Sequence, residues 1–448
     1  MAETDVAYNL ALDYLYSFVD YSLKHSSELA RADFNLDRMR LLMSELGNPQ
    51  LQYPILHVAG TKGKGSVCAL AASGLRAAGY RVGLYTSPHL LDYCERIQLD
   101  GTPVSHDGLV ALVEAVKPAV ARIPKLTTFE ITTALGLLYF ANQKADAAVI
   151  EVGLGGRLDA TNVVTPRISV ITSLSYDHMA VLGDTLAKIA GEKAGIIKDH
   201  IPVVSAPQKE EALEVLVRTA RERNAPFTLV GRDVTFRPLG HSLEGQSLRL
   251  IGRDQALTMR IPLLGAHQVQ NAATAVAALW TMRESGLDIP DLAIQSGFSK
   301  VEWPARFQVV RREPPVVLDS AHNQDSFARL RQALDDYFPG RPIYLIFGAS
   351  EDKNIPGMFA EIKSKIKNLI ITQADHPRAL PPQRIAEFAE AAGIPHGIVS
   401  SVSEAFAAAL GLSAKDGSIV VSAGSMFVTA EALAVWQASR SKDREQGV

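Results

Sequence analysis

The stretch YPILHVAGTKGKGSVCALAASGLRAAG, residues 53–79, sets the expected fold of this chain. A short apolar run typical of a buried strand leads into a glycine-rich turn and then a helical pattern that ends at Gly79. This order presents backbone N–H groups and the positive end of a helix dipole to a phosphate. The sequence of this turn departs from the standard phosphate-binding pattern G-x-x-x-x-G-K-[ST]. Val58 stands in place of the first glycine and Gly65 in place of the Ser or Thr, so that the hydroxyl residue, Ser66, comes one position later. The alternative is a plain glycine turn that carries exposed lysines.

Composition bounds the class of protein. The 448 residues exceed one ordinary core, so two or three domains are expected. A formal charge of −3 gives no general attraction to nucleic acid or anionic membrane. Two cysteines exclude a disulfide framework. The N-terminus lacks a signal-peptide pattern and no apolar run approaches a membrane span, so we expect a cytoplasmic protein.

The pattern of elements predicts an α/β fold. Strands and helices alternate up to about residue 225, which indicates a P-loop ATPase domain with a parallel sheet covered on both faces. The runs FTLVGRDVTF, SLRLIGR and ALTMRIPL then predict a small antiparallel β subdomain. A second alternation after Pro304 predicts a smaller, Rossmann-like α/β domain. We therefore expect an N-terminal ATP-binding domain at 1–298, a linker at 299–305 and a C-terminal domain at 306–448.

Polar side chains follow several of the predicted strands. Glu151 ends one apolar strand, Asp177 and His178 follow another, and Ser87 and His89 follow a third. Open α/β sheets bind ligands at this edge, and a carboxylate there suits Mg²⁺, which prefers oxygen ligands. Each residue also has a plain alternative: the carboxylate can cap a turn, and a single histidine is commonly a hydrogen-bonded structural residue. Their convergence favours a nucleotide–metal site.

Two further regions are less specific. The helical stretch GEKAGIIK places Lys193 where spacing alone predicts a solvated helix face. In the second domain, Asp319, His322 and Asn323 follow a strand, and Arg306 lies beside the predicted domain boundary. Ligand sites are common where domains meet.

Several longer motifs resemble a known family. AGTKGKGS, TSPHL with ERI, TTFEITTALGLLYF, EVGLGGRLDATN, DHMAVLGDTLAKIAGEKAGIIK, QNAATAVAAL, PARFQVV and LDSAHN occur in the order expected of folylpolyglutamate synthases and dihydrofolate synthases, within the Mur ligase superfamily. The resemblance covers about residues 30–430. It implies an ATP- and Mg²⁺-dependent ligase that adds L-glutamate to dihydropteroate, to the glutamate tail of reduced folates, or to both, through an acyl phosphate. It also implies small-molecule substrates and a monomer without nucleic-acid or membrane partners.

The resemblance assigns roles to individual residues. Those implied in catalysis are Lys64, Glu151, His178 and Lys193, the last as the lysine that this family carbamylates. Those implied in ATP binding are Gly60, Thr61, Lys62, Gly63, Lys64, Gly65, Ser66, Asn271, Arg306, Asp319 and His322. The implied magnesium ligands are Ser87, Glu151 and His178. The implied pterin-binding residues are Asp33, Phe34, Asn35, Thr127, Thr128, Phe129, Glu130, Leu158, Asp159 and Ala160.

Other functions fit the sequence less well. A peptidoglycan-precursor ligase with a UDP-linked substrate needs an additional N-terminal α/β domain, and only about 55 residues precede the glycine loop. A P-loop NTPase switch does not account for the second α/β domain and the unusual loop. A nucleotide-binding module without catalysis is a further alternative, which full biological activity of a Lys64→Ala variant would favour.

Overall fold

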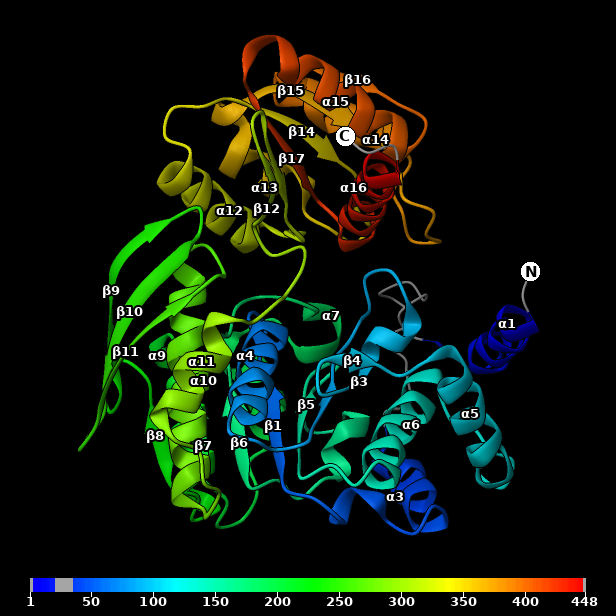
Figure 1. The fold of residues 1–448 in the computed structure, drawn as a ribbon, viewed down its shortest axis with the longest axis vertical. Helices are drawn as coiled ribbons and strands as arrows, with labels where there is room; N and C mark the ends of the chain where they lie inside the picture. The colour runs from blue at the N-terminus through cyan, green and yellow to red at the C-terminus, as the bar shows by residue number, and fades with distance from the viewer. Residues whose placement is uncertain (1–2, 21–34, 446–448) are drawn as a thin grey trace. The chain divides into compact units, whose positions relative to one another are not determined.

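A computed structural model describes residues 3–20 and 35–445 (Figure 1). The chain divides into two compact units. Unit 1 comprises Met1–Gly240, Ser247–Pro262 and Gln268–Val301, and unit 2 comprises His241–Gln246, Leu263–His267 and Glu302–Val448. The main division follows Val301, within the stretch where the periodicity stops. Unit 2 also takes in His241–Gln246, at the turn between the first two strands of the β subdomain, and Leu263–His267, just after its last strand. Local sequence patterns do not reveal this division.

Unit 1 is built on an eight-stranded sheet in the order β4-β3-β2-β5-β1-β6-β7-β8. The strands are β1 (Ile55–Ala59), β2 (Val82–Tyr85), β3 (Ile97–Leu99), β4 (Thr102–Pro103), β5 (Ala147–Glu151), β6 (Ile168–Ile171), β7 (Val203–Ser205) and β8 (Phe227–Leu229). Neighbouring strands are parallel except at one edge, where β3 is antiparallel to both β2 and β4. The next strands along the chain, β2 to β5, all lie on one side of β1 in the sheet, whereas β6 lies on its other side. The carboxyl end of β1 is thus a switch point, where such sheets bind ligands.

The helices of unit 1 cover this sheet. They are α1 (Glu3–Tyr16), α3 (Leu36–Glu45), α4 (Lys64–Ala77), α5 (His106–Val120), α6 (Thr128–Asn142), α7 (Met179–Leu182), α8 (Leu186–Ala194), α9 (Glu210–Glu222), α10 (Ala266–Glu284) and α11 (Asp291–Ser299), with short 3₁₀ helices η1 (Pro49–Leu51), η2 (Tyr93–Arg96) and η3 (Ala160–Val163). One apolar cluster joins Ile55 and Ile150 to α1, α5 and α6, and another joins Ala59 and Ile171 to α8 and α9. Ile55 and Ala59 are four residues apart on β1, so both clusters lie on the same face of the sheet.

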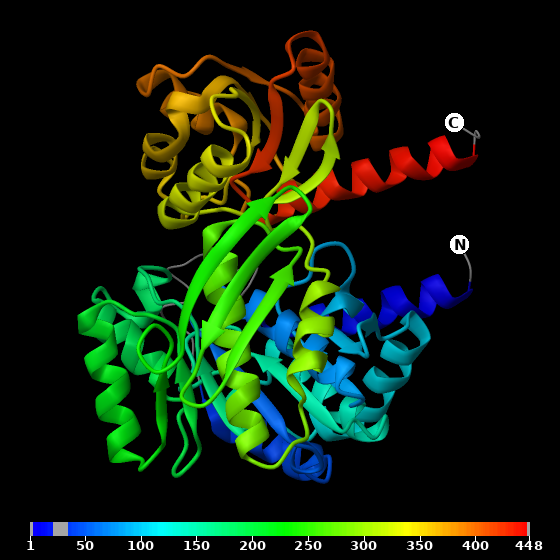
Figure 2. The ribbon, with the colours of Figure 1, turned by 60° about the vertical axis from the view of Figure 1, so that its left-hand side comes forward.

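The β subdomain differs in part from the prediction. FTLVGRDVTF was expected to be one antiparallel strand, but it forms two elements. Its first half is β8, which pairs in parallel with β7 in the large sheet. A turn follows in which Gly231 has φ +95° and the Asp233 carboxylate accepts the Leu229 N–H. Strand β9 (Thr235–Ser242) begins only after that turn and joins β10 (Gly245–Ile251) and β11 (Ala256–Ile261) in a three-stranded sheet (Figure 2).

Unit 2 has a six-stranded sheet in the order β12-β13-β17-β14-β15-β16. Its strands are β12 (Gln308–Arg312), β13 (Pro315–Leu318), β14 (Ile343–Phe347), β15 (Ile366–Ile371), β16 (His396–Ile398) and β17 (Ile419–Ala423). Its helices are α12 (Gln324–Tyr337), α13 (Ile355–Ile362), α14 (Pro382–Ala391), α15 (Val402–Asp416) and α16 (Met426–Glu445), with the 3₁₀ helix η4 (Lys363–Lys365). Only β12 is antiparallel to its neighbour. The predicted α/β fold class, with a smaller second α/β unit, is confirmed.

Candidate active site

The glycine loop joins β1 to α4, as predicted. The N–H groups of Thr61 and Lys62 both donate to the Ser173 carbonyl at 3.0 Å, which ties the first half of the loop to the segment after β6. Gly63 is the N-cap of α4 and supplies no side-chain cap. By helix geometry the next N–H groups, those of Lys64, Gly65 and Ser66, lack a partner within the helix. The second half of the loop therefore has the form of an anion site.

Two glycines make the loop's path possible. Gly60 has φ +154°, and a Cβ there would lie 1.8 Å from Thr172 Oγ1. Gly63 has φ +86°, and a Cβ there would lie 2.3 Å from Asn271 Oδ1. Asn271 is buried in α10 and donates to Gln268 Oε1 at 2.9 Å. The structure thus brings Asn271, one of the residues implied in ATP binding, against the loop.

We expect Gly63→Ala to weaken nucleotide binding strongly. The added Cβ clashes with the Asn271 side chain, and alanine must adopt a left-handed conformation that costs on the order of 1–2 kcal/mol. ATP affinity, measured by calorimetry, should fall by about tenfold or more. Gly79→Ala is the matched control, because Gly79 also has a positive φ of +93° but a Cβ added there would meet nothing within 4 Å. Equal losses of affinity in both variants would contradict this account.

Glu151 lies at the end of β5, beside the loop. It is buried, and its Oε1 lies 3.8 Å from Lys64 Nζ. Its Oε2 accepts the Ser87 N–H at 3.2 Å. Three residues predicted from different segments, Lys64, Ser87 and Glu151, are therefore brought together. Carboxylate and hydroxyl oxygens are hard donors that suit Mg²⁺, so Glu151 and Ser87 fit a magnesium site in their chemistry.

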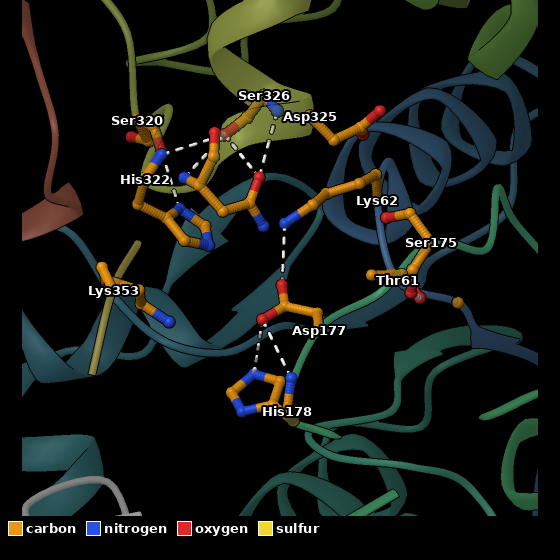
Figure 3. A network of polar contacts seen from close by, with 12 residues as sticks. Thr61, Lys62, Ser175, Asp177, His178, Ser320, His322, Asp325, Ser326 and Lys353 are labelled. Carbon is orange, nitrogen blue, oxygen red and sulfur yellow. Dashed lines mark hydrogen bonds and ion pairs between the residues drawn. The ribbon is translucent and has the colours of Figure 1, made fainter. Parts of the chain in front are cut away.

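Lys62 points to a partner in the segment after β6. Its Nζ lies 2.8 Å from Asp177 Oδ2, and the side chains are only 16% and 12% exposed (Figure 3). The other Asp177 oxygen accepts the His178 N–H at 3.0 Å and lies 3.9 Å from His178 Nε2. His178 has φ 50° and a side chain that is 41% exposed. Lys62 thus holds the segment that positions His178.

We expect this ion pair to be structural. Lys62→Met and Asp177→Asn should each lower the free energy of unfolding by about 1–3 kcal/mol, the cost of leaving a half-buried charge without its main partner. The double variant should lose no more than either single variant, because both charges are then gone. Denaturant unfolding of the four proteins measures this cycle. Additive losses would show that Lys62 and Asp177 act independently.

Lys193 is buried rather than solvated. Its side chain donates from Nζ to the Gly60 carbonyl at 2.9 Å, which places it directly under the glycine loop. Burial, together with the nearby positive charge of Lys64, lowers the pKa of Lys193 to about 7. A large fraction of this amine is therefore neutral near neutral pH. The plain interpretation of Lys193 as part of a solvated helix face is wrong.

Two glycines, Gly156 in EVGLGGRLDATN and Gly195 at the end of α8, allow the loop after β5 and the end of α8 to lie close together. A Cβ at Gly156 would lie 3.0 Å from the Lys193 carbonyl oxygen, and one at Gly195 would lie 2.4 Å from Arg157 Cα. The Arg157 N–H also donates to the Glu192 carbonyl at 2.8 Å. This backbone contact fixes the position of Lys193, and it explains why small residues are needed on both sides.

The implied pterin-binding residues fall into distinct surroundings. Thr127 and Glu130 form a capping box at the start of α6, and Glu130 Oε1 also accepts from Arg38 Nε at 3.1 Å. Thr128 donates to the Leu15 carbonyl at 2.9 Å. Phe129 is partly exposed, and its ring covers Gly153, where a Cβ would lie 2.5 Å from the ring. Of these four side chains, only that of Phe129 is not fully buried.

Three of the other implied pterin residues, Leu158, Asp159 and Ala160, follow the glycines of the loop after β5. Asp159 is buried and its two oxygens accept from the Leu154 and Thr161 N–H groups at 2.8 and 3.0 Å. Burial raises the pKa of Asp159. Leu158 is half-buried and Ala160 is buried. Asn35 caps α3 by accepting the Asp37 N–H, and Asp33 and Phe34 lie outside the described residues.

Unit 2 positions its candidate residues around Asp319. This carboxylate is half-buried and accepts the Phe307 and Ala321 N–H groups at 2.7 and 2.8 Å. Burial raises the pKa of Asp319, while the charge of Arg306 opposes this shift. Ala305 and Phe307, on either side of Arg306, have φ 56° and 44°. Asp319 therefore stabilises a strained turn that carries Arg306.

His322 follows the same strand in unit 2. Its Nδ1 lies 2.9 Å from the Ser320 carbonyl, and its N–H donates to Ser326 Oγ at 3.0 Å (Figure 3). Asn323 next to it forms a capping box with Ser326 at the start of α12. The imidazole is thus oriented by its own turn, and the implied role of His322 in nucleotide binding stays a prediction.

Comparison with known proteins identifies the family. The Mur ligase middle domain matches residues 58–279, and the Mur ligase glutamate ligase domain matches residues 305–426. A dihydrofolate synthase/folylpolyglutamate synthase of Bacillus subtilis is 41% identical over 356 residues, which cover 77% of this chain and 82% of the relative. The chain belongs to the folylpolyglutamate synthase and dihydrofolate synthase family of Mur ligases. It is therefore an ATP-dependent ligase.

Solved structures of this family share the fold. The folylpolyglutamate synthase of Mycobacterium tuberculosis complexed with ADP has a TM-score of 0.88 and 31% identity, covering 97% of this chain and 99% of its own. Escherichia coli FolC in complex with DHPP and ADP has a TM-score of 0.86 and 30% identity, covering 97% and 98%. Within the described ranges of this family member, no helix combines the length and apolar character that spanning a membrane requires.

Some contacts of this ligase have little signature in the sequence. His57 on β1 is fully buried, and its Nε2 lies 2.9 Å from Thr161 Oγ1, which in turn donates to Asp159. Burial lowers the pKa of His57 to about 3, so the ring is neutral. Its position in the apolar run was the available signal, because a polar residue inside a buried strand needs a hydrogen-bond partner. The partner itself, 104 residues away, could not be identified.

Proposed function

We propose that this chain adds L-glutamate to dihydropteroate, to the glutamate tail of reduced folates, or to both. ATP phosphorylates the acceptor carboxylate, giving ADP and an acyl phosphate. The glutamate amine then attacks the acyl carbon, the new amide bond forms and phosphate leaves. The observation that carries the proposal is the grouping of Lys64, Glu151 and Ser87 beside the uncapped start of α4. The substrate class, pteroates and folates, is taken from relatives such as the dihydrofolate synthase/folylpolyglutamate synthase of Bacillus subtilis.

The N-terminus of α4 and Lys64 are proposed to hold the phosphates. Phosphoryl transfer needs positioning and charge neutralisation more than covalent help from the protein. The N–H groups of the first helical turn and the Lys64 ammonium supply fixed positive charge at this point. Asn271, which packs against Gly63, supports the loop from α10. In unit 2, Arg306, Asp319 and His322 are proposed as ATP-binding residues.

Ser87, Glu151 and His178 are proposed to hold Mg²⁺. When bound, this ion would neutralise phosphate charge. A buried carboxylate such as that of Glu151 is stable only with positive charge nearby. Lys64 Nζ, 3.8 Å away, supplies such a charge, and Mg²⁺ would add to it. His178 is the weaker member of the set, since imidazole suits Mg²⁺ less well than oxygen donors.

Lys193 is proposed to carry a carbamate. The neutral amine attacks CO₂, the C–N bond forms as one C=O π bond breaks, and one amine proton leaves to solvent, so that the neutral amine becomes an anionic carbamate. The lowered pKa of Lys193 favours this reaction, because only the neutral amine is a nucleophile. The resulting negative charge would lie under the glycine loop, where it would support Lys64 and the metal.

The acceptor is proposed to bind beside the loop at 153–160. Phe129 offers a ring face for a pterin to stack on, and flat aromatic pairs of this kind contribute about 0.5–1.5 kcal/mol beyond the area they bury. Leu158, Asp159 and Ala160 are the adjoining residues. Thr127, Thr128 and Glu130 act mainly by fixing the start of α6, since their polar atoms are used in the capping box and in contacts with α1 and Arg38. We further expect a cytoplasmic monomer, which size-exclusion chromatography tests for its oligomeric part.

The choice of acceptor is tested directly with purified enzyme. Dihydropteroate and tetrahydrofolate are supplied separately with ATP, Mg²⁺ and L-glutamate, and the products are identified by mass. The proposal expects a product heavier by one glutamate residue with at least one of the two acceptors. Absence of a glutamylated product with both acceptors would overturn it.

A further inference from the structure

A cluster of side chains of metal-ligating types lies in unit 1, in residues that the proposed ligase reaction does not use. Asp92, Cys94 and His106 each offer one ligand atom, and these three atoms lie within 4.8 Å of one another. Asp92 is the N-cap of η2, Cys94 lies within η2, and His106 is the first residue of α5. All three positions are therefore fixed by regular elements, η2 and the start of α5.

The side chains are already held in place. Asp92 Oδ2 lies 2.9 Å from His106 Nε2, and Asp92 Oδ1 accepts the Cys94 N–H at 2.7 Å. Tyr8 on α1 donates its hydroxyl to Asp92 Oδ1 at 3.1 Å. Its ring stacks on the His106 imidazole, with centroids 3.7 Å apart and the planes within 5°. Ligands whose rotamers are fixed by neighbours bind a metal at a lower entropic cost.

We propose that Asp92, Cys94 and His106 form a binding site for a thiophilic divalent cation, with Zn²⁺ as the best fit. Sulfur, imidazole nitrogen and carboxylate oxygen together are the donor set that Zn²⁺ and Co²⁺ accept readily, whereas Mg²⁺ requires oxygen donors. Three protein ligands leave one position of a tetrahedron for water. The side chains of Asp92 and His106 are 40% and 37% exposed, so the cation can enter from solvent.

The charges at this site balance on binding. Cys94 is buried beside the Asp92 carboxylate, and a cysteine in such surroundings keeps its thiol proton when no metal is bound. When sulfur binds the cation, the thiol proton leaves to solvent. The thiolate and the Asp92 carboxylate then cancel the two positive charges of the ion. A neutral cluster suits this partly buried position better than an isolated charge does.

Such an ion would connect α1 to the segment 92–106. Tyr8 contacts both Asp92 and His106, so a metal that fixes these two residues also fixes the surface on which α1 packs. The competing explanation is that the cluster is only a hydrogen-bonded cap of η2, completed by the Asp92–Glu95 capping box. That explanation predicts no stoichiometric affinity for Zn²⁺ or Co²⁺.

The test is a titration of the chelator-treated full chain with Co²⁺, without ATP or folate. We expect a thiolate-to-cobalt charge-transfer band that saturates at one equivalent and disappears when Zn²⁺ is added. Because the chain has only two cysteines, Cys94→Ser and Cys68→Ala form a matched pair. The band should be lost in Cys94→Ser and strongly weakened in His106→Gln, and it should remain in Cys68→Ala.

Thermal unfolding gives an independent measurement. Zn²⁺ should raise the unfolding temperature of the wild type and of Cys68→Ala, because it binds only the folded chain, and it should leave Cys94→Ser unchanged. Absence of the band in wild-type protein, or its persistence in folded Cys94→Ser, would overturn the proposal. Neither measurement depends on ligase activity, so this proposal and the proposed function can fail separately.

Discussion

Lys193→Ala should lower kcat by about 100-fold while the protein remains folded. The expected size is the upper end of the 10- to 100-fold losses that follow removal of groups supporting a metal site. Lys193 Nζ lies 2.9 Å from the Gly60 carbonyl, beneath the loop proposed to hold the phosphates. Alanine removes both this contact and the proposed carbamate. Steady-state kinetics of the variant, together with its unfolding curve, separate loss of catalysis from loss of folding.

Lys188→Ala is the matched control for Lys193. It lies on the same helix, is 62% exposed and pairs only with Asp184 among the contacts described for its ammonium group, so its removal should leave kcat within about twofold, as expected of an exposed pair. A Lys193→Ala variant with normal kcat would contradict the assigned role. An equal loss in Lys188→Ala would point to a general effect on the helix instead.

The carbamate itself is tested by its dependence on pH. The pKa of Lys193 is lowered to about 7, so the amine is protonated and unreactive below that pH and neutral above it. At a fixed concentration of dissolved CO₂, reactivation of CO₂-depleted enzyme should therefore be faster at about pH 8 than at about pH 6. Isotope-labelled bicarbonate should place its label on Lys193. Labelling that is absent at both pH values would contradict carbamylation.

Glu151→Gln should lower kcat by on the order of 10²–10³, as does removal of one charge-stabilising group from other active sites. Glutamine keeps the shape and can still accept the Ser87 N–H, but it removes the negative charge 3.8 Å from Lys64. ATP affinity should change little, because the loop and the α4 N-terminus are intact. Calorimetry with ATP and product formation measured on the same preparation test both halves of this expectation.

Glu192→Gln provides the comparison for Glu151. Glu192 pairs with Arg157, whose side chain is 56% exposed, and such surface pairs contribute about 0–1 kcal/mol. The substitution has the same chemistry and lies next to Lys193, so it controls for a change of net charge near the site. Full turnover in Glu151→Gln, or an equal loss in Glu192→Gln, would refute the proposed metal-supporting role of Glu151.

The sequence predicted the order of strands and helices well where the signal is local. The strand, glycine turn and helix at 53–79 correspond to β1, the loop and α4, because each depends on periodicity and glycine placement within a few residues. The stretch at 227–236 was predicted wrongly because its local signal does not show where the strand breaks. It reads as one β-rich run, and the turn at Gly231–Asp233 that sends β8 and β9 into different sheets is short.

The sequence indicated individual candidate residues but not the contacts between them. Strand ends placed Glu151 and Ser87 at the ligand edge, because parallel strands bring their carboxyl ends together. Helical spacing could not show that Lys193 is buried, since its burial depends on the close approach of Gly156 and the turn after α8. The ion pair of Lys62 and Asp177 joins residues 115 apart and required the fold.

The central claim is that ATP is consumed to join glutamate to an acceptor, and the stoichiometry of ADP release tests it most directly. Purified enzyme is given ATP and Mg²⁺, with the acceptor and L-glutamate supplied together, singly or not at all. We predict one ADP and one phosphate per amide formed when both substrates are present, and only slow ADP release when either is missing. ATP consumption at the same rate without acceptor and glutamate would contradict the claim.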